Sequence, residues 1–353
     1  MNNITNTTAT FQPSSNSSSS INSYNSSSFT SSTLIPLIIC GIFGVGSVGN
    51  ALIIFVISKS KNLRKTATNI YILNMAITDL LFVSSLPLFA LQYAMNMQWP
   101  FSDNHETLGN FVCKTNRMIT RLNLFCTIYF IMALALHRWM MINPNSRKKS
   151  KNSNNNSTFF ANFNNSGIKA KKLCLLIWCL GFFVSIPDFV YSSVRFSKVT
   201  NSSVCAFGPE IKEKADISFY MKFMGYFDVV HFVITYIFPS TVILVCYVLL
   251  IRLVNKKLVA SQRTKSASKT VLTVVVAYYV CWTPYNIHKI LRSICGYFRA
   301  CSAETSGLLR SFFSPIEPFL IILAFSNSCL NPIIYAFTLD QFNDSLIKVS
   351  EKF

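Results

Sequence analysis

The sequence contains little charge, and most of the charge that it has is of one sign. Of its 353 residues only 13% are charged and 51% are hydrophobic, and 32 lysines and arginines outnumber 13 acidic residues. Soluble domains carry about 25% charged residues, so this composition indicates that lipid is part of the solvent. The net charge of +19 does not indicate nucleic-acid binding, because the basic residues form short clusters between long apolar runs.

The sequence also lacks the short motifs of common enzymes. It contains no Walker loop, no HExxH, no GxSxG and no paired carboxylates at hydrolase spacing. We therefore expect no catalytic residues and no enzymatic cofactor. A transporter or channel is disfavoured as well, because neither inverted repeats nor several intramembrane charges are visible.

No charged residue precedes Lys59, and residues 1–33 are mostly Asn, Ser and Thr. Such a composition cannot bury a core, so we expect a disordered tail. The tail lacks the basic start and early apolar stretch of a cleaved signal peptide, which predicts that the first span acts as a signal anchor. Glycosylation acceptors of the form N-x-S/T begin at Asn3, Asn6, Asn16, Asn25 and Asn201.

Long apolar runs predict an all-α membrane protein, a bundle of seven transmembrane helices over residues 34–338. Because lipid offers no partners for bare backbone groups, continuous helices are expected rather than a barrel. The runs that can cross about 30 Å of hydrocarbon lie near 34–58, 68–93, 117–142, 172–194, 226–252, 270–294 and 309–337.

Basic clusters set the expected orientation. They follow the first, third and fifth spans, so the positive-inside rule places those loops in the cytoplasm and the N-terminus outside, as in a multi-pass plasma-membrane protein. The Asn-rich segment 145–170 in the second of these loops is predicted to be a disordered insertion. Residues 339–353 have the pattern of a short amphipathic helix lying on the membrane surface.

One group of motifs falls on each span, in order along the chain. The set resembles the signature of the rhodopsin-like (class A) G-protein-coupled receptors, which implies an extracellular ligand and a heterotrimeric G protein as partners. The matching residues are Asn50, LNMAITDL with Asp79, Cys113, Arg138, Trp178, Pro239 with Tyr247, CWTPY at 281–285 and NPIIY at 331–335.

Three further strings resemble the peptide-receptor branch that holds somatostatin, opioid, galanin and chemokine receptors. They are Ser85-Leu-Pro87, WPF at 99–101 and SNSCLNPIIYAF at 326–337. This resemblance implies a neuropeptide ligand and an inhibitory-type G protein. The alternatives are a chemokine-like or other non-peptide ligand, or a non-signalling ligand scavenger of the same fold.

Two cysteine pairs are candidates for disulfides. The resemblance implies a bridge between Cys113, at the top of the third span, and Cys205, in the second outer loop. Cys295 and Cys301 lie in one short outer loop, and either a bridge within the loop or two free thiols fits the sequence.

Asp79 is an ionisable group at membrane depth, which is costly and therefore a functional candidate. By resemblance its neighbours carry oxygen or amide groups, and such a set holds an allosteric sodium ion in related receptors. A water cluster around a protonated Asp79 is the alternative. The neighbours implied are Asn123, Thr127, Asn327, Ser328 and Asn331, together with Trp282.

The resemblance also implies an activation switch. Arg138 stands where the family contacts the G protein, but the sequence reads HRW rather than DRY, so His137 replaces the acid that restrains the arginine. Pro284 removes a backbone donor beside Trp282 and predicts a hinge in the sixth helix. Tyr247 and Tyr335 are implied to move in beside Arg138 on activation.

The helical register predicts which residues face an outer ligand cavity. Thr120 replaces the aspartate by which amine, opioid and somatostatin-type receptors pair with a cationic ligand group. Instead the cavity is expected to be basic, which favours an acidic side chain or a C-terminal carboxylate on the ligand. The predicted lining is Gln92, Arg117, Thr120, Arg121, Asp188, His231, Tyr285, His288, Lys289, Arg292, Glu317, Ile321 and Phe325, with Asp228 nearby.

Overall fold

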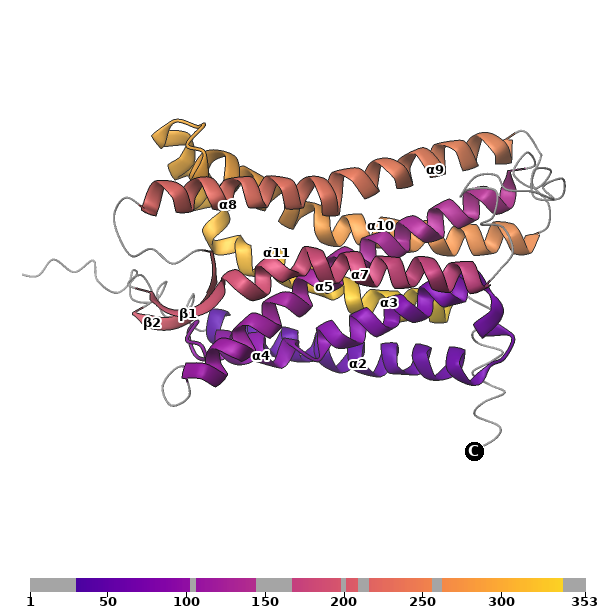
Figure 1. Cartoon of the computed structure of the whole chain (residues 1–353), viewed down its shortest axis with the longest axis horizontal. Helices are drawn as coiled ribbons and strands as arrows, with labels where there is room; N and C mark the ends of the chain where they lie inside the picture. Colours follow the sequence, from indigo (N-terminus) through magenta and orange to yellow (C-terminus); the bar gives the residue numbers. More distant parts are fainter. Residues whose placement is uncertain are drawn as a thin grey trace, which may run out of the picture.

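In the part of the chain that the structure describes, seven long helices lie side by side along the long axis of the molecule (Figure 1). The computed structural model describes residues 30–101, 106–143, 167–197, 201–208, 216–255 and 262–338. Each of the seven helices is long and apolar enough to cross a membrane, which confirms the predicted bundle and a multi-pass membrane protein. The spans are Ser32–Lys59, Ala67–Ala94, Thr107–Ile142, Gly167–Tyr191, Ile217–Leu253, Thr270–Tyr297 and Ala303–Phe337.

Several spans are built from more than one helical element. The second combines α3 and α4, the fifth combines α8, η4 and α9, and the sixth combines α10 and η5. The elements in chain order are η1 (Thr30–Leu34), α2 (Ile35–Lys59), η2 (Leu63–Lys65), α3 (Ala67–Val83), α4 (Leu86–Ala94), α5 (Glu106–Ile142), α7 (Gly167–Tyr191), β1 (Ser192–Ser197), β2 (Ser202–Phe207), α8 (Asp216–Phe232), η4 (Val233–Ile237), α9 (Phe238–Asn255), α10 (Gln262–Arg292), η5 (Ser293–Tyr297) and α11 (Ala303–Thr338).

Prolines explain where the spans are interrupted. Pro87 cannot donate a backbone hydrogen bond and its ring would clash with the carbonyl of Val83, so α3 ends at Val83 and α4 starts afresh at Leu86. In the fifth span the π-turn η4 ends at Ile237, two residues before Pro239, which lacks the N–H that would donate to the carbonyl of Thr235. Pro284 lies inside α10, as the hinge prediction requires.

Five predicted helix starts lie too late in the sequence. The third to seventh spans were expected from 117, 172, 226, 270 and 309, but α5, α7, α8, α10 and α11 begin at Glu106, Gly167, Asp216, Gln262 and Ala303. The extra turns contain polar residues, so hydropathy alone does not detect them. The fourth span was expected to reach 194, but α7 ends at Tyr191 and the chain continues as a strand.

An antiparallel hairpin that the sequence analysis did not predict covers one end of the bundle. Strands β1 and β2 pair from Ser192↔Phe207 to Ser197↔Ser202 (Figure 1). We call this end of the bundle the hairpin end and the opposite end, at the foot of α5, the Arg138 end. The Trp99 backbone N–H donates to the Ser203 carbonyl over 2.7 Å, which fixes β2 to the segment after α4.

Polar side chains from the motifs join helices inside the apolar core. Trp178 donates through Nε1 to Oδ1 of Asn74 over 3.0 Å, and Asn50 donates through Nδ2 to the Ser328 carbonyl over 2.9 Å. Interhelical hydrogen bonds of this kind replace the hydrophobic driving force that lipid does not supply. They hold α3 against α7 and α2 against α11.

Some predictions fall outside the described residues. These are the disordered tail with Asn3, Asn6, Asn16 and Asn25, the insertion at 145–166, and the surface helix after Thr338. Asn201 is described, and it lies exposed in the turn between β1 and β2 with a φ of 49°. Whether it is glycosylated stays a prediction.

Candidate functional site

Two disulfides frame the hairpin end. Cys113 on α5 is bridged to Cys205 on β2, and Cys295 in η5 is bridged to Cys301. Both predicted bridges are confirmed, and the second excludes the alternative of free thiols. The first bridge packs with Trp99 in a small apolar cluster and fixes the hairpin over the bundle.

A cavity of about 120 Å³ opens below the hairpin. It is lined from α4, α5, α7, α8, α10 and α11, and most of the predicted ligand-facing residues lie on it. The lining is Phe89, Arg117, Thr120, Arg121, Leu124, Asp188, His231, Trp282, Tyr285, Asn286, Lys289, Ile321, Ala324 and Phe325.

Four predicted ligand-facing residues lie elsewhere. His288, Arg292 and Glu317 line a second cavity of about 280 Å³ between α10 and α11, where Arg292 and Glu317 form a half-exposed ion pair at 3.6 Å. Gln92 lines neither of these two cavities. It follows the break between α3 and α4, which changes the register that the sequence analysis assumed to be continuous.

Four residues on the ligand cavity were missed. Leu124 lies one turn beyond Thr120, and Ala324 lies one turn beyond Ile321, so helical spacing could have identified both. Phe89 and Asn286 are also part of the lining. Leu124 and Ala324 have aliphatic side chains, which give no charge or hydrogen-bonding group to mark them as ligand-facing in the sequence.

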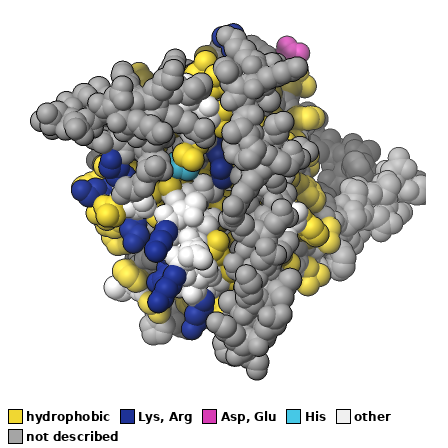
Figure 2. Space-filling view, turned by 90° about the vertical axis from the view of Figure 1, so that its right-hand side faces the viewer, with side chains coloured by type: hydrophobic (Ala, Val, Ile, Leu, Met, Phe, Trp, Pro, Cys, Tyr) yellow, Lys and Arg dark blue, Asp and Glu magenta, His cyan; other side chains and the backbone are white. Residues whose placement is uncertain are grey.

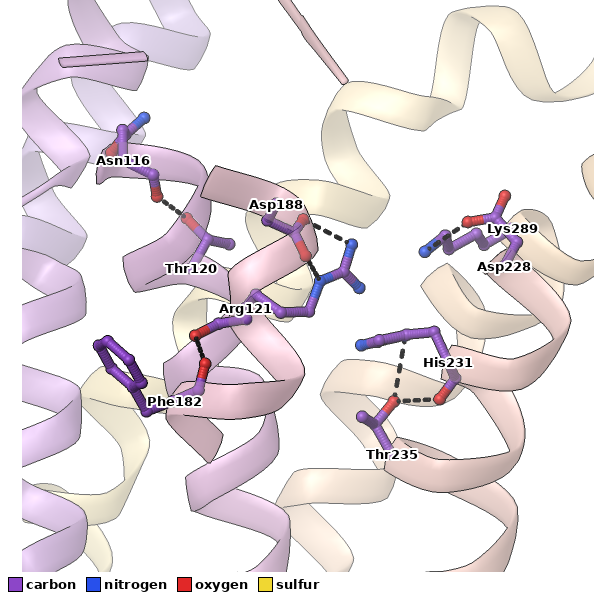
Figure 3. A network of polar contacts seen from close by, with 10 residues as sticks. Asn116, Thr120, Arg121, Phe182, Asp188, Asp228, His231, Thr235 and Lys289 are labelled. Atoms are coloured by element: carbon purple, nitrogen blue, oxygen red, sulfur yellow. Dashed lines mark hydrogen bonds and ion pairs between the residues drawn. The ribbon is translucent and has the colours of Figure 1, made fainter. Parts of the chain in front are cut away.

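Two ion pairs neutralise most of the charge around this cavity (Figure 3). Arg121 donates to Asp188 through Nε over 2.8 Å and through Nη2 over 2.9 Å. Lys289 lies 2.9 Å from Asp228, whose other oxygen accepts a hydrogen bond from Ser293 over 2.8 Å. The first pair joins α5 to α7 and the second joins α10 to α8. Because two of the cations are neutralised in this way, the net positive charge at the cavity is smaller than the number of lysines and arginines suggests.

Asp79 lies fully buried in the middle of the bundle and accepts three hydrogen bonds. Asn123 and Ser328 donate to Oδ1 and Asn331 donates to Oδ2, each over 2.9 Å. Thr127 belongs to the same cluster, because its hydroxyl accepts from Asn123 over 3.4 Å.

Asn327 departs from the expected polar set. Its side-chain oxygen and nitrogen are buried and form no hydrogen bond with any residue that the structure describes. Asn327 is buried on α11 next to Ser328, but its own side chain does not donate to the Asp79 carboxylate.

The predicted switch residues lie between the cavity and the Arg138 end. Trp282 lines the cavity floor, and the buried hydroxyls of Tyr247 and Tyr335 have no hydrogen-bond partner within the described part of the chain. Nε of Arg138 is likewise buried without such a partner. His137 is buried, and its ring lies edge-on to Tyr71 with 6.3 Å between the ring centroids.

A family model for the seven-transmembrane receptors of the rhodopsin family matches residues 49–335. The chain belongs to this family. Its members are receptors and not enzymes, in agreement with the missing catalytic motifs.

Named receptors are similar to this receptor over most of its length. Relaxin-3 receptor 1 of Homo sapiens is 26% identical over 320 residues, which are 84% of this chain and 65% of that protein. Somatostatin receptor type 2 of Mus musculus is 29% identical over 315 residues, or 86% of this chain and 74% of that one. Type-1 angiotensin II receptor of Bos taurus is 28% identical over 310 residues, or 85% and 76%. The chain thus spans about two thirds to three quarters of the length of these relatives.

Proposed function

We propose that this protein is a plasma-membrane receptor that transmits the binding of a peptide ligand in the hairpin-end cavity to a heterotrimeric G protein at the Arg138 end. One observation carries the proposal. A cavity lies under a disulfide-tethered hairpin at one end of the bundle. Toward the other end of the same bundle, Arg138, Tyr247 and Tyr335 have buried polar atoms without a hydrogen-bond partner among the described residues.

The charge distribution supports the orientation. Lysine and arginine side chains gather on the face that the molecule presents at the Arg138 end (Figure 2). The positive-inside rule therefore favours this end as cytoplasmic and the hairpin end, with the N-terminus, as extracellular. The described cations at this end are Lys59, Lys61, Arg64, Lys65, Lys169, Lys171, Lys172 and Arg252.

A peptide ligand is supported by the relatives, which are receptors for relaxin-3, somatostatin and angiotensin II. Thr120 on the cavity wall offers no negative charge to a cationic amine, because its hydroxyl is neutral. That hydroxyl donates to the Asn116 carbonyl over 2.9 Å. The finer assignments, a neuropeptide ligand and an inhibitory-type G protein, rest on the motif resemblance alone.

We also propose that sodium binds beside Asp79 in the resting receptor. The chemistry of the donor set fits, since Ser328 and Thr127 bring hydroxyl oxygens to the Asp79 cluster, and the carboxylate has no basic partner among the described residues. Asn331 donates to the carboxylate through Nδ2, and its buried Oδ1 has no hydrogen-bond partner among the described residues. A buried carboxylate needs either a proton or a cation to offset its charge. Bound sodium would supply that positive charge and hold the surrounding helices in one arrangement.

The function can be tested with a synthetic library of neuropeptides on cells that carry a sensor for G-protein dissociation. We expect at least one peptide to dissociate an inhibitory-type G protein in cells with the native receptor. The matched control is Arg138→Ala at equal surface expression, which should bind the same peptide without the response. A peptide that binds the native receptor and is internalised while no G-protein class dissociates would instead establish the non-signalling scavenger.

A further inference from the structure

The cations of the ligand cavity differ in whether an acid already neutralises them. Arg121 is paired with Asp188 and Lys289 with Asp228, and the paired groups are nearly buried: Asp188 and Asp228 have side-chain exposures of only 4% and 5%. An ion pair of this kind attracts a third charged group only weakly, because the charge of each member is already neutralised by the opposite charge of its partner at short distance. The sequence predicts Arg117, Arg121 and Lys289 alike on the cavity lining, and the two ion pairs distinguish Arg121 and Lys289 from Arg117.

Arg117 is different. It lines the same cavity, and its one hydrogen bond within the described part of the chain runs from Nη2 to the Cys205 carbonyl over 3.3 Å. A guanidinium has five N–H donors in a planar fork, so a neutral carbonyl leaves both its charge and most of its donors available. Three cations, Arg117, Arg121 and Lys289, against two acids, Asp188 and Asp228, leave one positive charge at the cavity, on Arg117.

The hairpin holds this guanidinium in position. Cys205, whose carbonyl accepts from Arg117, is bridged to Cys113 one helical turn away on α5. Strand β1 is fixed to the same helix, since the Val194 N–H donates to Oδ1 of Asn110 over 2.8 Å. A side chain that is held before the ligand arrives loses less conformational freedom on binding, which favours affinity.

We propose that Arg117 binds a carboxylate of the ligand, and that Arg121 and Lys289 position the cavity walls instead of contacting that group. This inference rests on the proposed function, since it assigns the ligand's anchoring group within the same cavity. A carboxylate accepts two parallel hydrogen bonds from the guanidinium fork and supplies the negative charge that the cavity lacks. The carboxylate can come from the C-terminus of a peptide or from an acidic side chain.

Direct binding of small probes tests the assignment without any G protein. Three compounds would be used: N-acetyl-phenylalanyl-leucine with a free carboxylate, the same dipeptide with a C-terminal carboxamide, and N-acetyl-phenylalanyl-glutamate with a carboxamide end. Each would carry a fluorine on its aromatic ring, and fluorine NMR would give the dissociation constant for the full-length receptor in lipid nanodiscs. The second and third compounds separate the two sources of the carboxylate.

We expect the better carboxylate compound to bind the native receptor about tenfold to a hundredfold more tightly than its neutral analogue, as a charge-assisted hydrogen bond predicts. Arg117→Gln should abolish this ratio, since glutamine can still donate to the Cys205 carbonyl but carries no charge. Arg117→Lys should retain part of the ratio, because lysine keeps the positive charge. Such retention would show that the loss in Arg117→Gln comes from the missing charge and not from misfolding.

The matched control is Lys114→Gln, which removes the same charge one turn away on α5. Lys114 lies over the Phe189 ring, 5.8 Å from its centroid, and is not on the cavity lining. This variant should keep the native ratio. An unchanged ratio in Arg117→Gln, or equal or absent binding of charged and neutral compounds to the native receptor, overturns the assignment. Neither result bears on G-protein activation, which the peptide-library experiment decides separately.

Discussion

Arg121 on α5 and Asp188 on α7 form a two-point ion pair, with Nε 2.8 Å and Nη2 2.9 Å from the two carboxylate oxygens. The pair lies inside the bundle, and the aromatic ring of Phe227 lies 5.4 Å from the guanidinium carbon. Its geometry indicates that it organises the cavity walls.

Removing one member of this pair should therefore lower the stability of the fold more than removing both members. Arg121→Leu leaves Asp188 buried without a partner, and we expect it to lower the stability by about 3 kcal/mol. Arg121→Leu combined with Asp188→Leu should recover most of that loss, because no uncompensated charge remains. Thermal unfolding of the purified variants in one detergent measures both effects. If the double variant is less stable than Arg121→Leu, the loss of stability does not come from an uncompensated buried charge.

The two disulfides should differ in importance. The bridge from Cys113 to Cys205 closes a separation of 92 residues and fixes the hairpin, whereas the bridge from Cys295 to Cys301 closes a separation of 6. A longer closed loop restricts the unfolded chain more, so Cys113→Ser or Cys205→Ser should remove surface expression or ligand response. The matched control Cys295→Ser should have a smaller effect. Equal surface expression of the two classes of variant would contradict this ranking.

The Asp79 cluster predicts a sodium effect on the ligand. Sodium chloride should lower agonist affinity for the native receptor by about tenfold relative to potassium chloride at the same ionic strength, because coupling between two sites is typically of this size. Asp79→Asn should bind agonist equally in both salts, since a neutral amide no longer compensates a monovalent ion. Competition binding of the radiolabelled agonist gives the affinities. Sodium sensitivity that survives in Asp79→Asn would exclude this site.

His137 offers a test of how Arg138 is restrained. In the structure His137 packs on Tyr71, and Nδ1 of its ring has no hydrogen-bond partner among the described residues. His137→Asp places a carboxylate beside Arg138, and a contribution of about 1.4 kcal/mol would change the ratio of resting to active receptor about tenfold. Basal nucleotide exchange should fall by this factor.

The matched control for that variant is His137→Asn, which has nearly the same shape without the charge. Basal exchange by His137→Asn should stay near the native rate at equal surface expression. If the two variants exchange nucleotide at the same rate, Arg138 is restrained by other groups and the neighbour's charge has no part in it.

The sequence predicted the bundle well because one physical property decides it. Uninterrupted apolar runs of membrane length leave few alternatives to helices, and the motif residues Asn50, Asp79 and Trp178 lie where the resemblance expected them. The hairpin was missed because β1 and β2 have only six residues each and β1 follows an apolar helix directly. The predicted bridge from Cys205 to Cys113 places the loop beside α5, but it does not reveal which residues of the loop pair with one another.

The charges of the cavity show the limit of prediction from sequence more clearly. The residues Arg117, Arg121 and Lys289 were all identified, but a sequence gives the number of charges and not their partners. Only the packing of α7 against α5 and of α8 against α10 shows that two of the three are neutralised. Gln92 was misplaced for a related reason, since the break before Pro87 rotates the rest of the second span.

In the function proposed for this receptor, ligand binding at the hairpin end drives nucleotide exchange at the Arg138 end. The most direct measurement is the rate at which a purified heterotrimeric G protein exchanges nucleotide on the receptor in lipid nanodiscs, with and without the active peptide, for the native chain and for Arg138→Ala. We predict that the peptide accelerates exchange on the native receptor, and that Arg138→Ala binds the peptide with exchange remaining at the basal rate. If the native receptor is saturated with peptide and nucleotide exchange is not accelerated for any G-protein class, ligand binding at the hairpin end does not drive exchange at the Arg138 end.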